Sequence, residues 1–226
     1  MSATMRLLHW VLRVTILLTC ASALAHTAHA QKPIPRDSAL LFALLPGHGV
    51  TSVPPEVRTR VLADRATLRL YASLLERRVQ SAYRWDTATV IWWLAESGDP
   101  AYVPIFLKFA RPTAHLVQFQ MAVYGLARSA SIDTAARRLR ELVRTQQGTE
   151  ASVLAAMLAA VNDTLTRSIL REFPRSRLSA FQQQRVTDVL ASPALARGEG
   201  RAFCPSPRVI GRDTDGRFRC IDSIKR

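Results

Sequence analysis

Two cysteines near the carboxyl end of the chain have the spacing of a covalent link. Cys204 and Cys220 are about 15 residues apart, with an Asp-Gly turn signal between two strand-like runs. In an oxidising compartment such a pair forms one disulfide, and the turn signal predicts a small hairpin that the bridge closes. A zinc site needs four ligands, and no histidine lies near these cysteines, so we expect no metal there.

Other residues that could bind a metal or act in catalysis lack partners at a useful spacing. Asp213 and Asp215 resemble part of a calcium loop, but the closing Glu is missing, which favours an ordinary turn. His48 and His115 have no Cys, Asp or Glu at ligand spacing, so we interpret them as solvated or packing residues. The sequence contains no nucleophile elbow, zinc-protease helix, phosphate-binding loop or dinucleotide fingerprint. We therefore expect neither a cofactor nor an enzymatic activity, although an enzyme of another type, with polar side chains converging in a deep cleft, remains an alternative.

Aromatic residues are concentrated in one part of the chain, around Trp92 and Trp93. Adjacent residues on a helix point about 100° apart, so the two indoles cannot both face the same neighbour. Either one indole lines a binding surface, where Trp and Arg are enriched, or both pack in the core, which is the interpretation that we favour. The candidate interaction surface consists of Trp92, Trp93, Tyr102, Arg137 and Arg138.

Apolar residues recur at intervals of three and four from Pro54 to about Leu190, and short Pro, Gly, Asp or Ser breaks separate the segments. This pattern predicts an all-α fold. We expect Asp86 and Asp133 at N-caps and Pro100 and Pro112 in first turns. The expected helices span residues 37–45, 55–80, 86–97, 101–110, 113–129, 133–146, 149–161, 164–173 and 176–191.

The breaks between these helices fall roughly 30 residues apart, which indicates a repeat of helix pairs. The segment Leu94-Ala95-Glu96-Ser97-Gly98-Asp99-Pro100-Ala101-Tyr102-Val103-Pro104 resembles the turn between repeats of the HEAT-like family in its short bacterial form. The resemblance covers about residues 86–192 and implies an α-α superhelix that presents one layer of helices to a partner. Units of this kind bury their apolar stripes only against their neighbours.

The first thirty residues have the composition of a secretory signal. Arg6 and Arg13 precede an apolar run over residues 14–25, and Ala28-His29-Ala30 forms a small-x-small cleavage site. The run is shorter than the roughly 20 residues that span a bilayer, so we expect cleavage after Ala30 and a periplasmic or secreted protein with no transmembrane segment. Lipidation at Cys20 and an uncleaved anchor are the alternatives.

These predictions define four regions: a signal peptide (1–30), a linker with a short helix (31–53), a helical repeat domain (54–193) and a tail with the Cys204–Cys220 hairpin (194–226). Without the signal, 31 − 2 = 29 Lys and Arg stand against 17 Asp and Glu, a formal charge of about +12. We expect a non-enzymatic scaffold that binds a protein partner. The alternative is a peripheral envelope protein that docks on anionic lipid or polysaccharide through its arginines. Nucleic acid is not an expected partner, because export removes the chain from it.

Overall fold

The computed structural model describes residues 55–76, 84–112, 114–204, 208–212, 214 and 218–222, all of which belong to the unit Leu44–Arg226. The expected signal peptide, the lipidation at Cys20, the linker and the helix at 37–45 lie outside the described residues. They remain predictions. Among the described residues, no helix is long and apolar enough to span a membrane.

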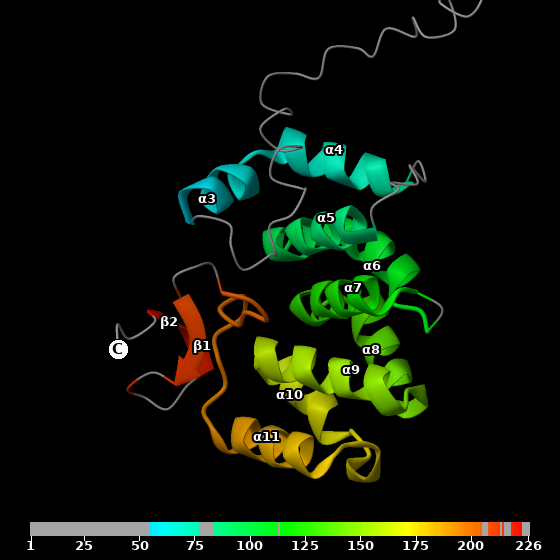
Figure 1. Ribbon diagram of the computed structural model, residues 1–226, viewed down its shortest axis with the longest axis vertical. Helices are drawn as coiled ribbons and strands as arrows, with labels where there is room; N and C mark the ends of the chain where they lie inside the picture. Colours follow the sequence, from blue (N-terminus) through cyan, green and yellow to red (C-terminus); the bar gives the residue numbers. More distant parts are fainter. Residues whose placement is uncertain are drawn as a thin grey trace, which may run out of the picture. The chain divides into compact units, whose positions relative to one another are not determined.

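The described chain from Pro55 to Ala191 is helical, which confirms the prediction of an all-α class for this region (Figure 1). Most expected helices begin and end within a few residues of their predicted bounds. The α-helices are α3 (Pro55–Ala63), α4 (Arg65–Glu76), α5 (Arg84–Ser97), α6 (Val103–Phe109), α7 (Leu116–Arg128), α8 (Asp133–Thr145), α9 (Gly148–Val161), α10 (Thr164–Arg171) and α11 (Ala180–Ala191). Two short 3₁₀ helices, η1 (Pro100–Tyr102) and η2 (Arg175–Arg177), precede α6 and α11.

The single long helix expected at 55–80 is wrong, because the chain breaks at Asp64. The Asp64 carboxylate accepts hydrogen bonds from the backbone N–H of Ala66, at 3.0 Å, and from the hydroxyl of Thr67, at 2.5 Å. A side chain that accepts in this way satisfies free donors of a helix start, so α4 begins as a separate helix. The hydrogen bond from Thr67, followed by the backbone contacts, lowers the pKa of Asp64 despite the opposing effect of desolvation.

Three expected helix starts also differ from the structure. Asp86, expected as an N-cap, is the third residue of α5. The N-cap of α8 is Ile132, and Asp133 is the first helical residue, where a carboxylate favours the positive end of the helix dipole. The prediction for Pro100 is confirmed, because Pro100 begins η1, whose N-cap Asp99 accepts a hydrogen bond from the N–H of Ala101. Pro112 lies outside any first turn, because α7 begins only at Leu116.

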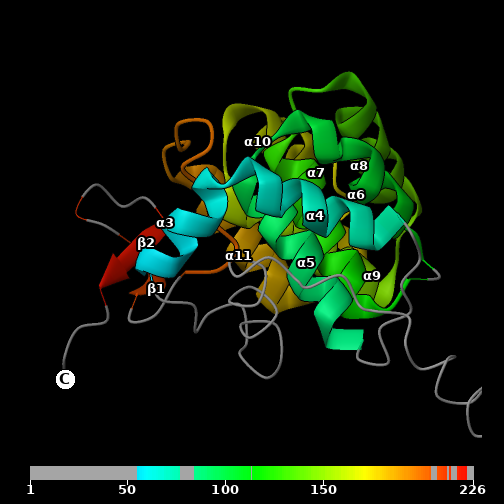
Figure 2. The same ribbon diagram turned by 90° about the horizontal axis from the view of Figure 1, so that it is seen from above.

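The helices from α4 to α11 alternate between two rows. We call α5, α7, α9 and α11 the odd row, and α4, α6, α8 and α10 the even row. Within the odd row each helix packs against the next, and in the even row α4 contacts α6, α6 contacts α8, and α8 contacts α10. Figure 2 shows α6, α8 and α10 on one side of this arrangement and α5, α9 and α11 on the other. Helices that are neighbours in sequence therefore lie in different rows and pack across them.

The core is centred on α5 and α7. Five consecutive residues of α5, Ile91 to Ala95, are all buried. Because successive helical residues point about 100° apart, five of them cover a full turn, so this part of α5 is enclosed on every side. In α7, Gly125 allows close approach to α6: a Cβ there would lie 2.7 Å from the ring of Phe106. The odd row is thus not an open layer along α5.

The predicted hairpin is present as two antiparallel strands, β1 (Arg208–Arg212) and β2 (Phe218–Asp222). The register pairs Ile210 with Cys220 and Arg212 with Phe218. Cys204 is buried just before this hairpin. The side chain of Cys220 lies outside the described residues, so the Cys204–Cys220 bridge remains a prediction.

Candidate functional site: arginine clusters at the helix ends

The most elaborate polar cluster surrounds Glu96, in the last turn of α5. The Glu96 side chain is 0% exposed, and its Oε2 forms ion pairs with Nη2 of Arg58, from α3, and with Nε of Arg201, at 3.5 Å. The hydroxyl of Tyr124, from α7, donates a hydrogen bond to Oε1. A carboxylate can remain charged at this depth only when it is paired and hydrogen-bonded in this way. Three distant segments of the chain therefore meet at one side chain.

Arg128, in the last turn of α7, completes the Glu96 cluster. Its Nη1 donates to the Tyr124 hydroxyl at 3.4 Å, and its Nη2 donates to the backbone oxygen of Glu96 at 3.5 Å. Burial is the main reason that the pKa of Tyr124 lies above its usual range, and the adjacent Glu96 carboxylate raises it further. The phenol thus stays protonated and remains a hydrogen-bond donor to Glu96.

Residues 193–204, which we call the strap, run from the end of α11 back across the carboxyl ends of the odd row (Figure 1). The N–H of Leu195 donates to the backbone oxygen of Asn162, just after α9, at 2.9 Å. Further along, Nη1 of Arg128 donates to the backbone oxygen of Gly200 at 3.2 Å. Gly200 lies so close to Val161 that a Cβ would be 1.9 Å from its carbonyl oxygen. The strap therefore contacts the end of α9 first and the end of α7 after it, so it runs back along the row toward α5.

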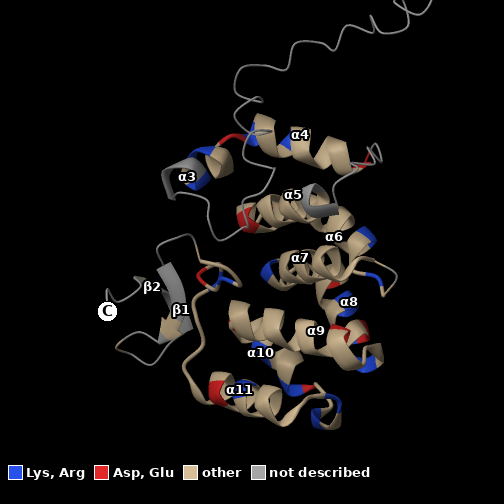
Figure 3. Cartoon of the chain, in the orientation of Figure 1, with Lys and Arg blue, Asp and Glu red and all other residues tan. Residues whose placement is uncertain are grey.

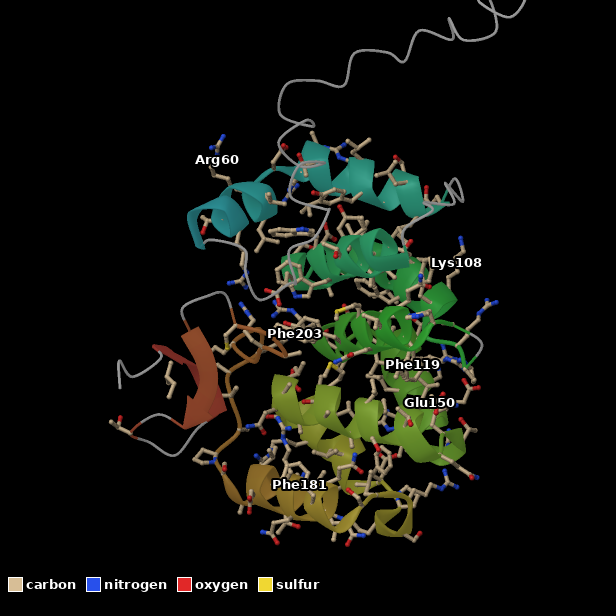
Figure 4. All side chains as sticks on the ribbon, viewed as in Figure 1. Arg60, Lys108, Phe119, Glu150, Phe181 and Phe203 are labelled. Carbon is tan, nitrogen blue, oxygen red and sulfur yellow. The ribbon has the colours of Figure 1, made fainter. Side chains whose placement is uncertain are left out.

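The strap ends in an aromatic contact beside the Glu96 cluster. The ring of Phe203, which is labelled in Figure 4, meets the ring of Tyr124 edge to face, with centroids 6.0 Å apart and planes at 89°. This geometry is the one that aromatic quadrupoles favour. Arg201 lies two residues earlier, so the same segment supplies an ion pair and a ring contact to neighbouring residues on α5 and α7.

A second buried arginine, Arg167 of α10, binds the end of α11. Its Nη1 donates to the backbone oxygens of Val189, at 2.8 Å, and Ser192, at 2.7 Å, and to the side-chain oxygen of Asn162, at 3.1 Å. Its Nη2 donates to the backbone oxygen of Leu190 at 2.7 Å. The last carbonyls of a helix have no partner within the helix, and a cation there also favours the negative end of the dipole. Arg167 supplies both effects from inside the protein.

Basic side chains also close the carboxyl ends of the even row at a regular spacing. Lys108 donates to the oxygen of Leu75 at the end of α4, and Arg138 donates to the oxygen of Ala110 at the end of α6. Arg177, in η2, donates to the oxygen of Arg144 at the end of α8. The donors follow their acceptors by 33, 28 and 33 residues. Each helix end in this series is thus bound by a basic side chain from the next helix pair along the chain. Sequence periodicity alone did not predict these contacts.

The five residues of the candidate interaction surface do not form an exposed patch. Trp92 and Trp93 are only 2% and 1% exposed, with ring centroids 4.7 Å apart. Both indoles therefore pack in the core, because α5 is enclosed on all sides. Tyr102 is buried as well, and Arg138 is bound to Ala110 and, at 2.8 Å, to Glu141. Of the five residues, only Arg137 is exposed.

The remaining candidates add no site. His48 lies outside the described residues, and His115 is exposed and forms the N-cap of α7 without a side-chain hydrogen bond. Within the described part of the chain, no group of three metal-binding side chains occurs.

No protein-family model, curated protein or solved structure matches this chain.

Proposed function

We propose that this chain is an exported, non-enzymatic helical scaffold that docks on an anionic surface through basic side chains of the even row. The observation that carries the proposal is that the even row exposes most of the charged side chains of these helices, and most of them are basic. The aromatic residues that favoured a protein partner in the sequence are buried, whereas the basic outer face of the even row is accessible.

Charge on the even row is predominantly positive. Its helices expose six basic side chains against three acidic ones, and one of the acidic ones, Glu141, is already paired with Arg138. Arg65 and Arg69 are one turn apart on α4, and Arg137 and Arg144 are two turns apart on α8, so each pair lies along one helix face. The exposed basic residues are Arg65, Arg69, Lys108, Arg137, Arg144 and Arg171, and the acidic ones are Glu76, Asp133 and Glu141.

Most of the odd row contrasts with this pattern, although α11 adds the exposed Arg185 and the half-buried Asp188. From Thr87 to Val161, helices α5, α7 and α9 contain three charged residues, of which Glu96 and Arg128 belong to the buried cluster and Glu150 lies in a first turn. Figure 3 shows these helices without charge over most of their length. A flat anionic partner such as a lipid surface would be attracted to the even row.

Two features support a scaffold made of repeated, HEAT-like helix pairs. Contacts run from each helix to the next one in its row, and in the basic caps on α4, α6 and α8 each donor follows its acceptor by 28 to 33 residues. We further propose that Cys204 pairs with Cys220 and closes the hairpin. Cys204 is buried, and the hairpin that contains Cys220 begins four residues after it, which supports this pairing and an oxidising location.

Vesicle binding tests the proposal. The protein should sediment with vesicles that contain an anionic phospholipid and should dissociate as salt rises, because charges farther apart than about 10 Å are screened at 0.1 M salt. The double substitution Arg137→Gln with Arg144→Gln should weaken binding about tenfold or more, since each surface cation contributes about 1 kcal/mol. Arg185→Gln, on exposed α11, is the matched control. Equal binding to neutral vesicles would contradict the proposal.

The second candidate function, binding to a protein partner, is favoured by one exposed aromatic residue. Phe181 on α11 is 74% exposed (Figure 4). An apolar contact through Phe181 would persist at high salt, and Phe181→Ser would abolish it. Salt dependence therefore distinguishes the two functions.

A further inference from the structure

The Glu96 cluster contains more positive than negative charge. Three guanidinium groups, those of Arg58, Arg128 and Arg201, gather around one carboxylate and one neutral phenol. Counted as formal charges, the cluster is 3 − 1 = +2. Cations that are partly removed from water are costly unless anions pair with them. In the described part of this cluster, one carboxylate thus faces three guanidinium groups.

Two donors of the Glu96 cluster have no acceptor. Nε of Arg58 and Nε of Arg128 are both buried, and among the described residues neither has a hydrogen-bond partner. Buried N–H donors are satisfied by protein, ordered water or a bound ion in the great majority of native structures. Two unsatisfied guanidinium donors in a cluster with surplus positive charge indicate an additional acceptor.

The pKa of Arg201 is lowered by its surroundings in the cluster. Burial lowers its pKa, and the charge of Arg128 lowers it further, so the positive form of Arg201 is held less favourably than in water. The Glu96 carboxylate raises the pKa of Arg201, but by less than burial and Arg128 together lower it. A bound anion would, like Glu96, stabilise the positive form of Arg201.

Two arginine side chains of the cluster are partly exposed to solvent. The Glu96 side chain is fully buried, but the side chains of Arg58 and Arg201 are 18% and 25% exposed. Arg58 belongs to α3 and Arg201 to the strap, so the accessible part lies where these two segments meet α5. A small ion could approach there without entering the helical core.

We propose that Arg58, Arg128 and Arg201 form a binding site for a small oxyanion, either inorganic phosphate or sulfate or the phosphate group of a larger molecule. Guanidinium groups present planar pairs of N–H donors that match the oxygens of such ions. This site is separate from the even-row surface and does not depend on the proposed docking function.

Calorimetric titration of the purified protein with inorganic phosphate tests the site, with chloride adjusted to hold ionic strength constant. We expect saturable binding to one site. Arg58→Lys keeps the charge that pairs with Glu96 but removes Nε, and it should weaken binding about tenfold, the effect of one lost charge-assisted hydrogen bond. The matched control Arg185→Gln should bind as the wild type does.

Glu96→Gln separates a binding role from a purely structural one. Removing the competing carboxylate releases Arg58 and Arg201, so phosphate should bind about tenfold more tightly, or more. If this variant fails to fold, Arg58→Lys still tests the site. Failure of wild-type protein to bind phosphate would overturn the proposal, and so would undiminished binding by Arg58→Lys.

Glycerol phosphate, a soluble stand-in for a headgroup, distinguishes the source of the ion. If it competes with phosphate, the site accepts a substituted phosphate; if it does not, while phosphate binds, the ligand is the free ion. Either result supports the oxyanion site. Phosphate binding that is lost in the Arg137→Gln and Arg144→Gln variant and retained in Arg58→Lys would show general surface attraction, and would overturn it.

Discussion

Nη1 of Arg167 lies 2.7 Å from the backbone oxygen of Ser192 and thereby joins α10 to the end of α11. The same guanidinium group also holds Asn162, whose backbone is left-handed with φ of 50° and whose backbone oxygen accepts from Leu195. The end of α9, the end of α11 and the start of the strap are thus held by one side chain and its immediate neighbour.

Replacing Arg167 should therefore destabilise the protein strongly. Arg167→Met fills a similar volume but leaves the backbone oxygens of α11 without donors, and we expect the free energy of unfolding to fall by about 3 kcal/mol. Urea denaturation measures the change. Arg171→Met, one turn further along α10 and exposed, is the control and should change stability by less than about 0.5 kcal/mol. Equal losses in the two variants would contradict a capping role for Arg167.

A methyl group at Gly200 should displace the strap. The Cβ of Gly200→Ala would lie 1.9 Å from the carbonyl oxygen of Val161, a backbone atom that side-chain rotation cannot move. We expect a loss of about 1 to 3 kcal/mol and faster hydrogen exchange at the Leu195 amide. Gly198→Ala is a matched control: φ is 82° there, but no atom lies within 4 Å of the new Cβ. It should cost about 1 kcal/mol through backbone strain, without faster exchange at Leu195. Equal exchange in the two variants would mean that the strap does not rest on Val161.

The tryptophan pair should be shielded from solvent. Trp92 and Trp93 are buried against each other, so once the other two tryptophans are removed by Trp10→Phe and Trp85→Phe the fluorescence should be blue-shifted and poorly quenched by acrylamide. Trp93→Ala should cost about 3 to 5 kcal/mol, the usual loss for a large aromatic residue in a core. Strong quenching in this double variant would show that Trp92 or Trp93 is exposed to solvent, as the interaction surface predicted from the sequence requires.

Sequence periodicity predicted most helices because it depends on neighbours three and four residues apart. It missed the break at Asp64, where a single capping side chain outweighs an apolar pattern that continues through it. It could not place Trp92 and Trp93, because adjacent positions indicate only that they point in different directions. An enclosed α5 buries both.

The arginine clusters were beyond sequence reasoning for another reason. Glu96 meets Arg58, Tyr124 and Arg201 from three distant segments, and Arg167 reaches backbone atoms more than twenty residues away. A pattern of charges along the chain identifies a basic protein. It does not show which arginines serve helix ends and which remain exposed, because that division depends on how the helix pairs pack.

Ionisation of Tyr71 should destabilise the protein in alkali. Burial raises the pKa of Tyr71 from 10.0 to about 12. A phenol whose pKa is higher in the folded state contributes stability that is fully present below pH 10 and is lost as the pH rises toward 12. The upper limit of the loss is about 2.7 kcal/mol, because one pKa unit corresponds to about 1.36 kcal/mol.

Tyr71→Phe removes this ionisation and should flatten the pH dependence of the unfolding free energy, measured by urea denaturation between pH 10 and pH 12. The decline should be reduced rather than abolished, because burial also raises the pKa of Tyr124. Tyr102→Phe is the matched control, since the pKa of Tyr102 is raised as well but Tyr102 is less enclosed than Tyr71. It should alter the slope less than Tyr71→Phe does. A Tyr71→Phe curve parallel to that of the wild type would show that the Tyr71 phenol ionises equally easily in the folded and unfolded chains, contrary to its burial in α4.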